Sequence, residues 1–309
     1  MQGRRWVQAV WGALKLGSMR LRFSQCLWMI RAKTSKILLQ IAKFSVFLLL
    51  IMTGNLNTLD NLLLRMPPIT LEEMKSVRLM KRMDTKFVTN RRQLERLLEL
   101  TTEQYFAQAA GDKRYAGYRT LYWDTPLTHE MFRQHHCGHF PRTKVRARTY
   151  LDSGHSFLEI KKKDNHGKTR KKRIAIPSIE AAVEQRVGEE FLQELTPYTF
   201  DTIVPTIENR FRRITLVNRN KTERLTIDFD LRFLNHETGQ EHAMPDVVII
   251  ELKRDGRVPS PIMSMLRALR IKPSGFSKYC VGSAITNQSL RQNRFKKRLR
   301  RYEKIVSKH

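Results

Sequence analysis

The chain has 309 residues, 41% of them hydrophobic, and 58 Lys and Arg against 29 Asp and Glu give a formal net charge of +29. The length suits one large domain or two small ones, and the hydrophobic fraction is sufficient for a core. Such a charge implies a polyanionic partner, which could be nucleic acid, an acidic membrane or a chain of phosphates. Three distant cysteines without a CxxC pair argue against a disulfide framework, so we expect a reducing, cytoplasmic location.

The excess of positive charge is concentrated at the two ends of the chain. Residues 1–59 contain nine Lys or Arg and no acid, and residues 286–309 contain nine and a single acid. We therefore predict three segments. These are a basic, partly apolar N-terminal segment over 1–58, a folded domain over 59–285, and a basic C-terminal helix or tail over 286–309.

The N-terminal segment is open to three interpretations. Its most apolar part, residues 37–52, is interrupted by two polar residues and falls short of the roughly 20 apolar residues of a membrane span. Residues 1–58 could follow a start codon placed too far upstream, form a basic membrane-surface or signal-anchor segment, or belong to the fold. The first interpretation is favoured, with Met52 and Met66 as alternative starts.

Two further clusters carry weaker signals. The run His135, His136, Cys137 and His139 offers adjacent ligands without a second cluster, which makes a poor zinc site, so a polar loop is favoured. The basic tail over 291–301 is interpreted as an accessory contact to a polyanion or a membrane surface. The basic run over 161–173 resembles a nucleic-acid or localisation patch. A hairpin with half of its charges inward explains that run equally well, and no specific nucleic acid is expected.

The most informative stretch is R-T-K-V-R-A-R-T-Y at residues 142–150. Alternate side chains of a strand point to opposite faces, so its four cations, Arg142, Lys144, Arg146 and Arg148, would share one face. Four like charges on one face repel one another and gain nothing unless an anion lies among them. The same alternation recurs in Arg82, Asp84 and Lys86, in Glu159, Lys161 and Lys163, in Lys171 and Arg173, in Arg224 and Asp228, and in Glu251 and Lys253.

About eight such strands, mostly joined as hairpins, predict an α+β fold in which an eight-stranded antiparallel β-barrel forms a tunnel with surrounding helices. One of these helices is expected over 178–195, capped by Ser178. A closed barrel has no exposed edge, and a lumen lined by cations must be wet and hold an anion. Carboxylates among the cations, here Glu159, Asp228 and Glu251, suit Mn²⁺ or Mg²⁺ bridged to phosphate oxygens.

Seven short motifs occur in one order over about residues 68–285. They are R-x-D-x-K-F at 82–87, Y-W-D-T at 122–125, R-x-K-V-R-x-R at 142–148, L-E-I-K-K-K at 158–163, R-L-T-I-D at 224–228, I-E-L-K at 250–253 and F-S-K-Y at 276–279. Together they resemble the VTC domain, the polyphosphate polymerase branch of the triphosphate tunnel metalloenzymes within the CYTH-like superfamily.

The resemblance implies a metal-dependent phosphotransferase that moves the γ-phosphate of ATP onto a growing inorganic polyphosphate chain. The residues that it implies as catalytic are Lys86, Arg146, Arg148, Lys161, Arg224 and Lys278. Further phosphate-binding residues would be Arg82, Arg142, Lys144, Lys163, Lys171, Arg173, Arg213 and Lys253. The metal ligand would be Glu251, with Glu159 and Asp228 as further candidates.

Two alternatives stay open at this point. The same tunnel could hydrolyse triphosphate or polyphosphate, or the protein could bind polyphosphate or RNA without catalysis. The related CYTH enzymes carry E-x-E-x-K on the first strand, whereas this chain has Arg82-Met83-Asp84-Thr85-Lys86. That departure weakens the assignment to a CYTH-type triphosphatase or cyclase.

Overall fold

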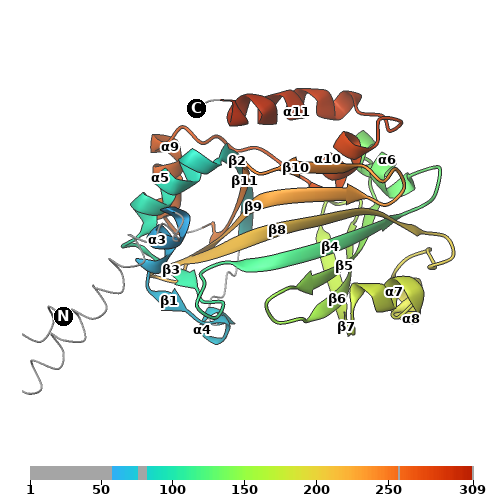
Figure 1. The fold of residues 1–309 in the computed structure, drawn as a ribbon, viewed down its shortest axis with the longest axis horizontal. Coiled ribbons are helices and arrows are strands. Elements are labelled where there is room, and N and C mark those ends of the chain that lie inside the picture. Colours follow the sequence, from blue (N-terminus) through green and yellow to red (C-terminus); the bar gives the residue numbers. More distant parts are fainter. Residues whose placement is uncertain (1–57, 76–81, 257, 308–309) are drawn as a thin grey trace, which may run out of the picture. The chain divides into compact units, whose positions relative to one another are not determined.

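Eleven strands form one sheet in the computed structural model, which describes residues 58–75, 82–256 and 258–307 (Figure 1). The predicted N-terminal segment over 1–58 therefore lies outside the described residues, except for its last residue. Eight strands follow the order β2-β11-β9-β8-β4-β5-β6-β7, and every neighbouring pair along this path is antiparallel. Their bounds are β2 Arg82–Asn90, β4 Ala116–Asp124, β5 Arg142–Tyr150, β6 Ser156–Lys163, β7 Thr169–Ile176, β8 Val204–Asn218, β9 Glu223–Asn235 and β11 Val247–Asp255.

The prediction of a closed eight-stranded barrel is wrong in two respects. Three short strands, β1 Pro68–Ile69, β3 Tyr105–Gln108 and β10 Glu241–Met244, extend the sheet beyond eight strands. They contain two to four residues each, too few for alternation to identify them. The sheet is also open, because β2 and β7 are its two end strands and do not pair with each other. Both end strands carry cations, and like charges oppose their closure into a barrel.

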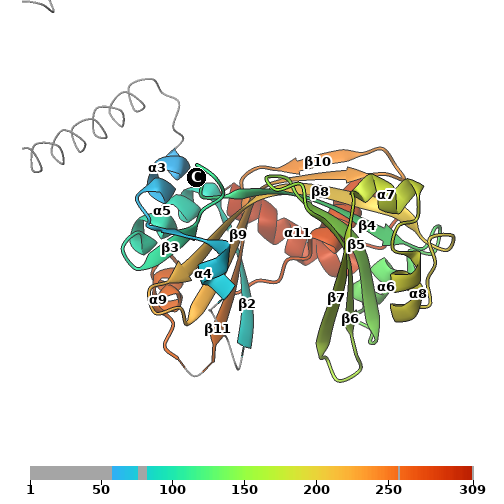
Figure 2. The ribbon, with the colours of Figure 1, turned by 90° about the horizontal axis from the view of Figure 1, so that it is seen from below.

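The sheet bends so that its two ends form opposing arms. Figure 2 shows β2 and β11 in one arm and β5, β6 and β7 in the other, with β8 and β9 running between them. We call these the β2–β11 arm and the β5–β7 arm. The concave side lies between the arms, and helices cover parts of the outer side.

Three apolar clusters hold these helices on the sheet, and the smallest joins Met74 of α4 to Val217 of β8. In the first, Leu94 and Leu98 of α5 pack with Phe87 and Ile250 of the β2–β11 arm. In the second, Met131 of α6 and Leu192 of α8 pack with Val145 and Leu158 of the β5–β7 arm. The helices are α3 Thr58–Leu64, α4 Leu71–Lys75, α5 Arg91–Thr101, α6 Glu130–Cys137, α7 Ile179–Glu184, α8 Glu189–Leu195, α9 Pro261–Ala268, α10 Lys278–Thr286 and α11 Asn293–Val306. On β2, β5, β6 and β11 the apolar side thus faces helices, and the charged side faces the concave space.

The helix expected over 178–195 is divided into α7 and α8. Ser178 caps α7 as predicted, because its hydroxyl accepts the N–H of Ala181 at 3.0 Å. The break comes at Arg186 and Gly188, which have φ of 55° and 99°. A Cβ on Gly188 would lie 2.6 Å from Leu158 Cδ2, so only glycine permits the turn to approach the sheet this closely.

The C-terminal helix α11 connects the two arms. At one end, Asn90 of β2 donates its side-chain N–H to the carbonyl of Ile305 at 2.8 Å. At the other end, Phe295 packs against Phe132 of α6, with ring centroids 5.8 Å apart. In Figure 2, α11 lies between the arms, as these contacts require. Within the part of the chain that the structure describes, no helix has the combination of length and apolar character that crossing a membrane requires.

Candidate phosphate-binding site

The concave side carries a continuous set of cations, which we call the basic face. In antiparallel strands, residues that oppose one another share a face. Arg146 opposes Glu159, which opposes Arg173, and Lys86 opposes Glu251. The basic face comprises Lys86, Arg142, Lys144, Arg146, Arg148, Lys161, Lys163, Lys171, Arg173, Arg213, Arg224 and Lys253, together with Lys278 from α10. Arg82 belongs to β2, but its side chain lies outside the description.

The two arms are close enough for their charges to interact. Lys161 of β6 is exposed overall, yet burial of its ammonium group is the largest cause that lowers its pKa, to about 8. The next causes are the positive charges of Lys144 and of Lys86, which lies on the opposite arm. The structure therefore brings cations of the β2–β11 arm and the β5–β7 arm into one electrostatic site, although 75 positions separate Lys86 from Lys161 in the chain.

Glu159 is buried beneath cations of the β5–β7 arm. Its Oε2 accepts from Arg146 Nε at 2.7 Å, and its Oε1 pairs with Lys171. Burial alone would raise the pKa of Glu159, but Arg146 and Arg148 overcome that effect and lower it to about 2. Because both oxygens have cationic partners, Glu159 orients Arg146 and Lys171 on the face.

Asp228 has the same arrangement near the centre of the sheet. Arg213 donates to both of its oxygens, at 2.5 and 2.8 Å, and Lys278 pairs with Oδ2. Burial opposes ionisation of this carboxyl, yet Arg213 and Lys278 hold its pKa well below the usual range. Asp228 thereby links strand β8 to helix α10 and fixes two of the predicted phosphate ligands.

Glu251 is the most accessible of the three predicted metal ligands. Its side chain is 22% exposed, against 1% for Glu159 and 5% for Asp228. Its Oε1 lies 3.1 Å from Lys86 Nζ, and its Oε2 has a longer contact of 3.8 Å with Lys253. Burial would raise its pKa, but Lys253 and Lys86 lower it to about 2, so the group is ionised at neutral pH.

The three carboxylates do not form a common metal cage. Among the described residues, no group of three His, Cys, Asp or Glu side chains could hold a metal ion. A single carboxylate of the basic face does suit a metal that is bound together with substrate phosphate, since Mg²⁺ is often held by one or two carboxylates plus substrate phosphates. Glu251 suits that role by its exposure and by its weakly engaged Oε2.

Among the described cations of the basic face, Arg148 is the only one that is buried. It is only 7% exposed, and its Nε donates to the hydroxyl of Thr120 at 3.1 Å. No carboxylate of the described residues forms an ion pair with it, and its pKa is lowered by burial and then by Arg146 and Arg213. A buried charge without an opposite charge is costly, so this position favours a bound anion.

An aromatic floor beneath the cations was not predicted from the sequence. The Arg213 guanidinium lies 4.9 Å from the centroid of Tyr118, and Lys278 Nζ lies 4.1 Å from that of Phe211. Arg146 Nη1 donates to the hydroxyl of Tyr122 at 3.2 Å. Ring faces attract cations and hold them in place without neutralising their charge. The aromatic-rich strand around Y-W-D-T was the signal that could have identified this floor.

Tyr122 has an unusual electrostatic environment. Burial would raise its pKa, but the positive charges of Arg146, Arg148 and Lys144 outweigh burial and lower it to about 8. Its ring also lies 5.2 Å from that of Tyr279, measured between centroids. Tyr122 therefore reports directly on the positive potential of the basic face.

Two of the sequence motifs meet in the structure and position Lys278. Tyr279 of F-S-K-Y donates its hydroxyl to Asp124 of Y-W-D-T. Asp124 also accepts the backbone N–H of Met131 and Phe132 at 2.8 and 2.9 Å, which holds the start of α6. The buried carboxylate thus ties α10 to β4 and α6, and α10 in turn presents Lys278 to the basic face.

One edge of the basic face extends onto an exposed ring. The cationic groups of Arg142 and Lys163 lie 4.9 and 5.0 Å from the ring centroid of Phe140, which is 43% exposed. Lys144 is close by in sequence and donates to the hydroxyl of Ser277 at 3.1 Å. These cations continue the site from the Arg146 region toward solvent.

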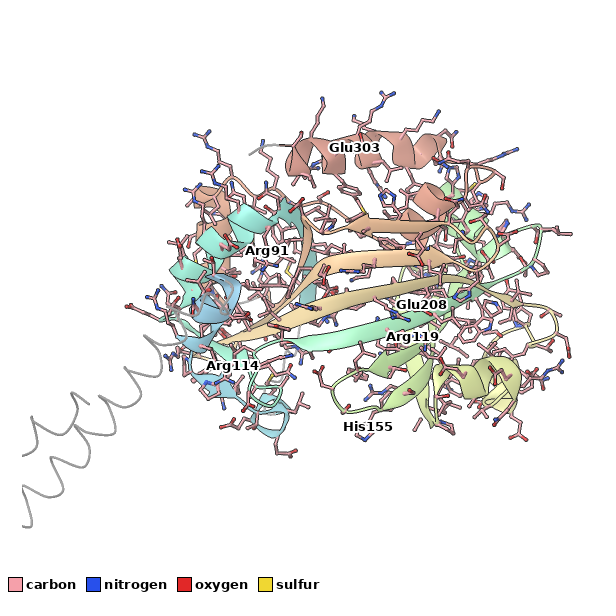
Figure 3. The ribbon with its side chains drawn as sticks, viewed as in Figure 1. Arg91, Arg114, Arg119, His155, Glu208 and Glu303 are labelled. Carbon is pink, nitrogen blue, oxygen red and sulfur yellow. The ribbon has the colours of Figure 1, made fainter. Side chains whose placement is uncertain are left out.

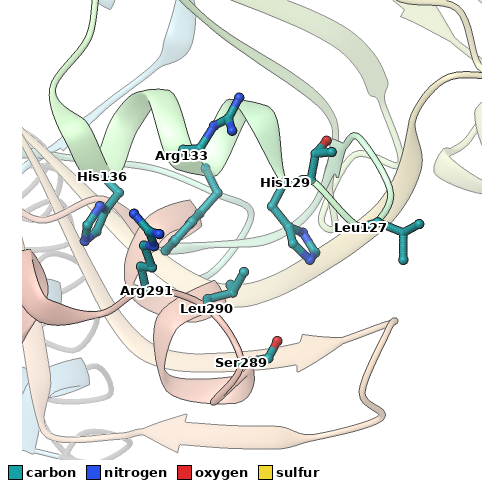
Figure 4. Close-up of a pocket in the computed structure, with 9 residues that line it drawn as sticks. Leu127, His129, Arg133, His136, Ser289, Leu290 and Arg291 are labelled. Atoms are coloured by element: carbon teal, nitrogen blue, oxygen red, sulfur yellow. The ribbon is translucent and has the colours of Figure 1, made fainter.

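The polar loop favoured for the run from His135 to His139 is wrong for His135, His136 and Cys137, which form the last turn of α6. A nearby hollow is separate from the basic face. His135 and His136 lie on α6, where His135 Nε2 is 3.3 Å from the carbonyl of Thr143 and His136 packs 5.4 Å from Phe295. A hollow between α6 and the connection from α10 to α11 is lined by His136 and Arg291, among others (Figure 4). None of its lining residues belongs to the basic face.

Comparison with known proteins identifies the family. The model of the VTC domain matches residues 81–287, which is two thirds of the chain. The chain therefore belongs to the VTC domain family, and the resemblance predicted from its motifs is confirmed. Among curated proteins, none matches the chain. The predicted segment boundaries after residues 58 and 285 stay predictions.

Solved structures offer more distant likenesses. An adenylate cyclase candidate from Bacillus halodurans is 13% identical, with 64% of this chain and 96% of that chain covered and a TM-score of 0.43. HpAC1 from Hippeastrum, an adenylyl cyclase candidate described with a dominant triphosphatase activity, is 15% identical, with 65% and 96% covered and a TM-score of 0.44. The PH1012 protein from Pyrococcus horikoshii is 15% identical, with 62% and 91% covered and a TM-score of 0.33.

Proposed function

We propose that this protein is a metal-dependent phosphotransferase that extends inorganic polyphosphate with the γ-phosphate of ATP. The observation that carries the proposal is Arg148 on β5, a 7% exposed guanidinium of the basic face that forms no ion pair with a carboxylate among the described residues. Membership of the VTC domain family supports the same reading. A row of cations along a concave sheet suits a linear chain of phosphates better than a compact anion.

In the proposed reaction, some cations of the basic face bind the transferred phosphoryl group and others bind the acceptor chain. Arg146, Arg148 and Lys161 bind oxygens of the transferred phosphoryl group and its neighbours, with the arginines able to donate two hydrogen bonds each. Arg142, Lys144 and the other cations of the β5–β7 arm hold the polyphosphate acceptor. Lys171 and Lys278 are oriented by Glu159 and Asp228, so they are held in place before the substrate arrives.

The chemical step requires no protein nucleophile. A terminal oxygen of the acceptor chain attacks the γ-phosphorus of ATP and forms a new P–O–P bond. The bond from that phosphorus to the bridging oxygen breaks, and ADP leaves with the electron pair. Positioning and neutralisation of charge carry most of the catalysis of such transfers. Fixed cations over an aromatic floor satisfy both requirements, because they do not have to reorganise during the step.

A divalent metal, Mn²⁺ or Mg²⁺, would be held by Glu251 together with phosphate oxygens. When bound, it supplies further neutralisation of phosphate charge and orients the phosphates. Glu159 and Asp228 were predicted as candidate ligands as well. Because their oxygens already pair with cations, we assign them the role of positioning Arg146, Lys171, Arg213 and Lys278.

The direct test is an assay of the full chain with ATP, a short polyphosphate primer and Mn²⁺ or Mg²⁺, followed by a gel stained for polyphosphate. Extension of the primer with stoichiometric release of ADP is expected. Free phosphate without chain growth would replace the proposal with hydrolysis. Polyphosphate binding without turnover of ATP would replace it with a binding function.

A pair of variants links the activity to the basic face. Arg148→Gln removes the uncompensated buried cation, and the rate of extension should fall at least 100-fold. Arg210→Gln removes an arginine that is 62% exposed and pairs with Glu208 away from the basic face, and it should leave the rate within twofold. Equal rates for the two variants would remove Arg148 from the site.

A further inference from the structure

The outer side of α11 carries a second, separate row of cations. On its inner side Phe295 and Tyr302 are buried at 5% and 1% exposure, and Leu299 packs on the same cluster. With 3.6 residues per turn, the positions opposite these residues, with Lys296 on the flank, form one stripe along the helix. This stripe consists of Lys296, Lys297, Arg300, Arg301 and Lys304, all exposed. Figure 3 shows side chains tipped with nitrogen pointing from α11 away from the sheet, with Glu303 labelled on the same helix.

These charges lack compensation within the chain. Among the described residues, no ion pair involves any cation of the stripe, and α11 contains a single acid, Glu303. Three pairs of like charges lie four positions apart: Lys296 with Arg300, Lys297 with Arg301, and Arg300 with Lys304. Like charges at that spacing destabilise a helix. An anion along the stripe would turn this repulsion into attraction.

The packing of α11 limits which polyanion fits. An amphipathic helix that lies on a membrane inserts its apolar face, but here that face is buried against the domain through Phe295 and Tyr302. Proteins that hold single-stranded nucleic acid add aromatic rings on which bases stack, and both aromatic residues of α11 point inward. The stripe thus offers charge alone, which suits a chain of phosphates without bases or acyl groups.

We propose that the stripe is an accessory binding surface for inorganic polyphosphate, distinct from the basic face between the arms. From Lys296 to Lys304 it extends about 12 Å at 1.5 Å per residue, enough to contact several consecutive phosphates. Helix α11 joins the two arms, so a chain that leaves the concave side can reach the stripe without dissociating from the protein. The choice of polyphosphate as the ligand rests on the proposed function, and the stripe would retain long chains there.

The test compares two full-length variants with the same change in charge. The first replaces Lys297, Arg300, Arg301 and Lys304 with Gln. The matched control replaces four exposed cations elsewhere, Arg92, Arg96, Lys113 and Lys272, with Gln. The dissociation constant for polyphosphate of about 100 units is measured over a series of salt concentrations, and that for tripolyphosphate is measured alongside.

For the stripe variant, we expect affinity for long polyphosphate to fall at least tenfold and its dependence on salt to become shallower, since fewer counterions are released. Affinity for tripolyphosphate and the rate of ATP turnover should stay within twofold, because the basic face is intact. The control should change affinity for long polyphosphate less than threefold. Equal losses in both variants would mean a general effect of net charge and would overturn the proposal.

Two further measurements identify the ligand. The affinities of the same proteins for duplex DNA and for vesicles that contain anionic lipid are measured under the same salt conditions. If the stripe variant loses affinity for either of these and keeps its affinity for long polyphosphate, the surface serves a different partner and the proposal is wrong. If the wild-type chain does not extend polyphosphate yet the stripe variant still loses affinity for it, the proposed activity fails while the accessory surface stands.

Discussion

The basic face and the α11 stripe are built from the same residue types but differ in how their charges are held. On the basic face, Arg146 contacts Glu159 and Tyr122, and Arg213 contacts Asp228 and Tyr118. On α11, cations such as Arg301 are exposed to solvent and form no ion pair among the described residues. The strand period of two places the cations of the basic face on the concave side of the sheet. The helical period of 3.6 places the cations of the stripe on the exposed side of α11.

This difference shows that burial and neighbouring charges determine how much a cation contributes to stability and turnover. Removing one partner of a buried ion pair leaves an uncompensated charge in a region of low dielectric constant, which is strongly destabilising. Exposed charges are screened by water and salt and contribute little. Substitutions on the basic face should therefore have large effects on turnover and stability, and those on the stripe small ones. The following predictions are ordered by expected size.

The largest effect is expected for Glu251→Gln. The change keeps the shape of the side chain but removes the charge that would hold a metal against phosphate. Turnover should fall about 1000-fold, which corresponds to about 4 kcal/mol of transition-state stabilisation. Rates are measured against Mn²⁺ and Mg²⁺ concentration at equal folded fraction. Glu194→Gln, which removes an exposed acid paired with Lys172, is the control. An unchanged rate and an unchanged metal midpoint would exclude Glu251 from the site.

The second prediction concerns the stability of the free protein. Glu159→Gln removes a carboxylate that is 1% exposed and leaves Arg146 and Lys171 without their shared partner. The free energy of unfolding should fall by about 3 kcal/mol, measured by urea denaturation. Glu194→Gln again provides the contrast, because Lys172 and Glu194 are 62% and 66% exposed. Glu194→Gln should lower the free energy of unfolding by less than about 0.5 kcal/mol. If the two variants lost the same amount, burial of the ion pair would not determine its contribution to stability.

The third prediction is a pH dependence. Burial lowers the pKa of Lys278 from 10.5 to about 8, with Asp228 opposing and Arg213 adding to the shift. The ammonium is charged below pH 8 and loses its proton above it, so phosphate binding and turnover should decline as pH rises through about 8. Stability should change in the opposite sense. Unfolded Lys278 retains its proton up to about pH 10.5, so the free energy of unfolding rises between pH 8 and 10.5.

The variant Lys278→Arg separates this residue from other titrating groups. Arginine stays charged throughout the range, so the alkaline decline in phosphate affinity should move to higher pH. Binding of tripolyphosphate is measured from pH 6.5 to 10 for both proteins. An alkaline midpoint that is the same in the two proteins would assign the decline to another group.

The smallest effect is expected on the α11 stripe. Arg301→Glu replaces one member of the like-charge pair with Lys297 by an opposite charge four positions along the helix. The melting temperature should rise by about 1 °C, because a single exposed pair contributes only a few tenths of a kcal/mol. Scanning calorimetry at low and high salt checks this, since salt should remove the gain. A decrease of several degrees would indicate that Arg301 has a structural partner.

The local patterns of the sequence determined much of the basic face. Alternation over 142–148 placed four cations on one side of a strand, and the same rule placed Glu251 beside Lys253. Ser178 was identified as a helix cap from its position alone. The order of seven motifs was enough to predict the family, which the match over residues 81–287 confirms. These features depend on neighbours in the chain, and local periodicity reports them directly.

Other features were decided only by contacts between distant segments. The sheet stays open between β2 and β7, and the helix over 178–195 breaks because Gly188 lies against Leu158. The carboxylate of Asp228 became the partner of Lys278, which follows it by fifty positions. Tyr122 became part of the floor beneath Arg146. Such pairings depend on how the strands bend and which helices cover them, and a period of two or 3.6 residues carries no information about either.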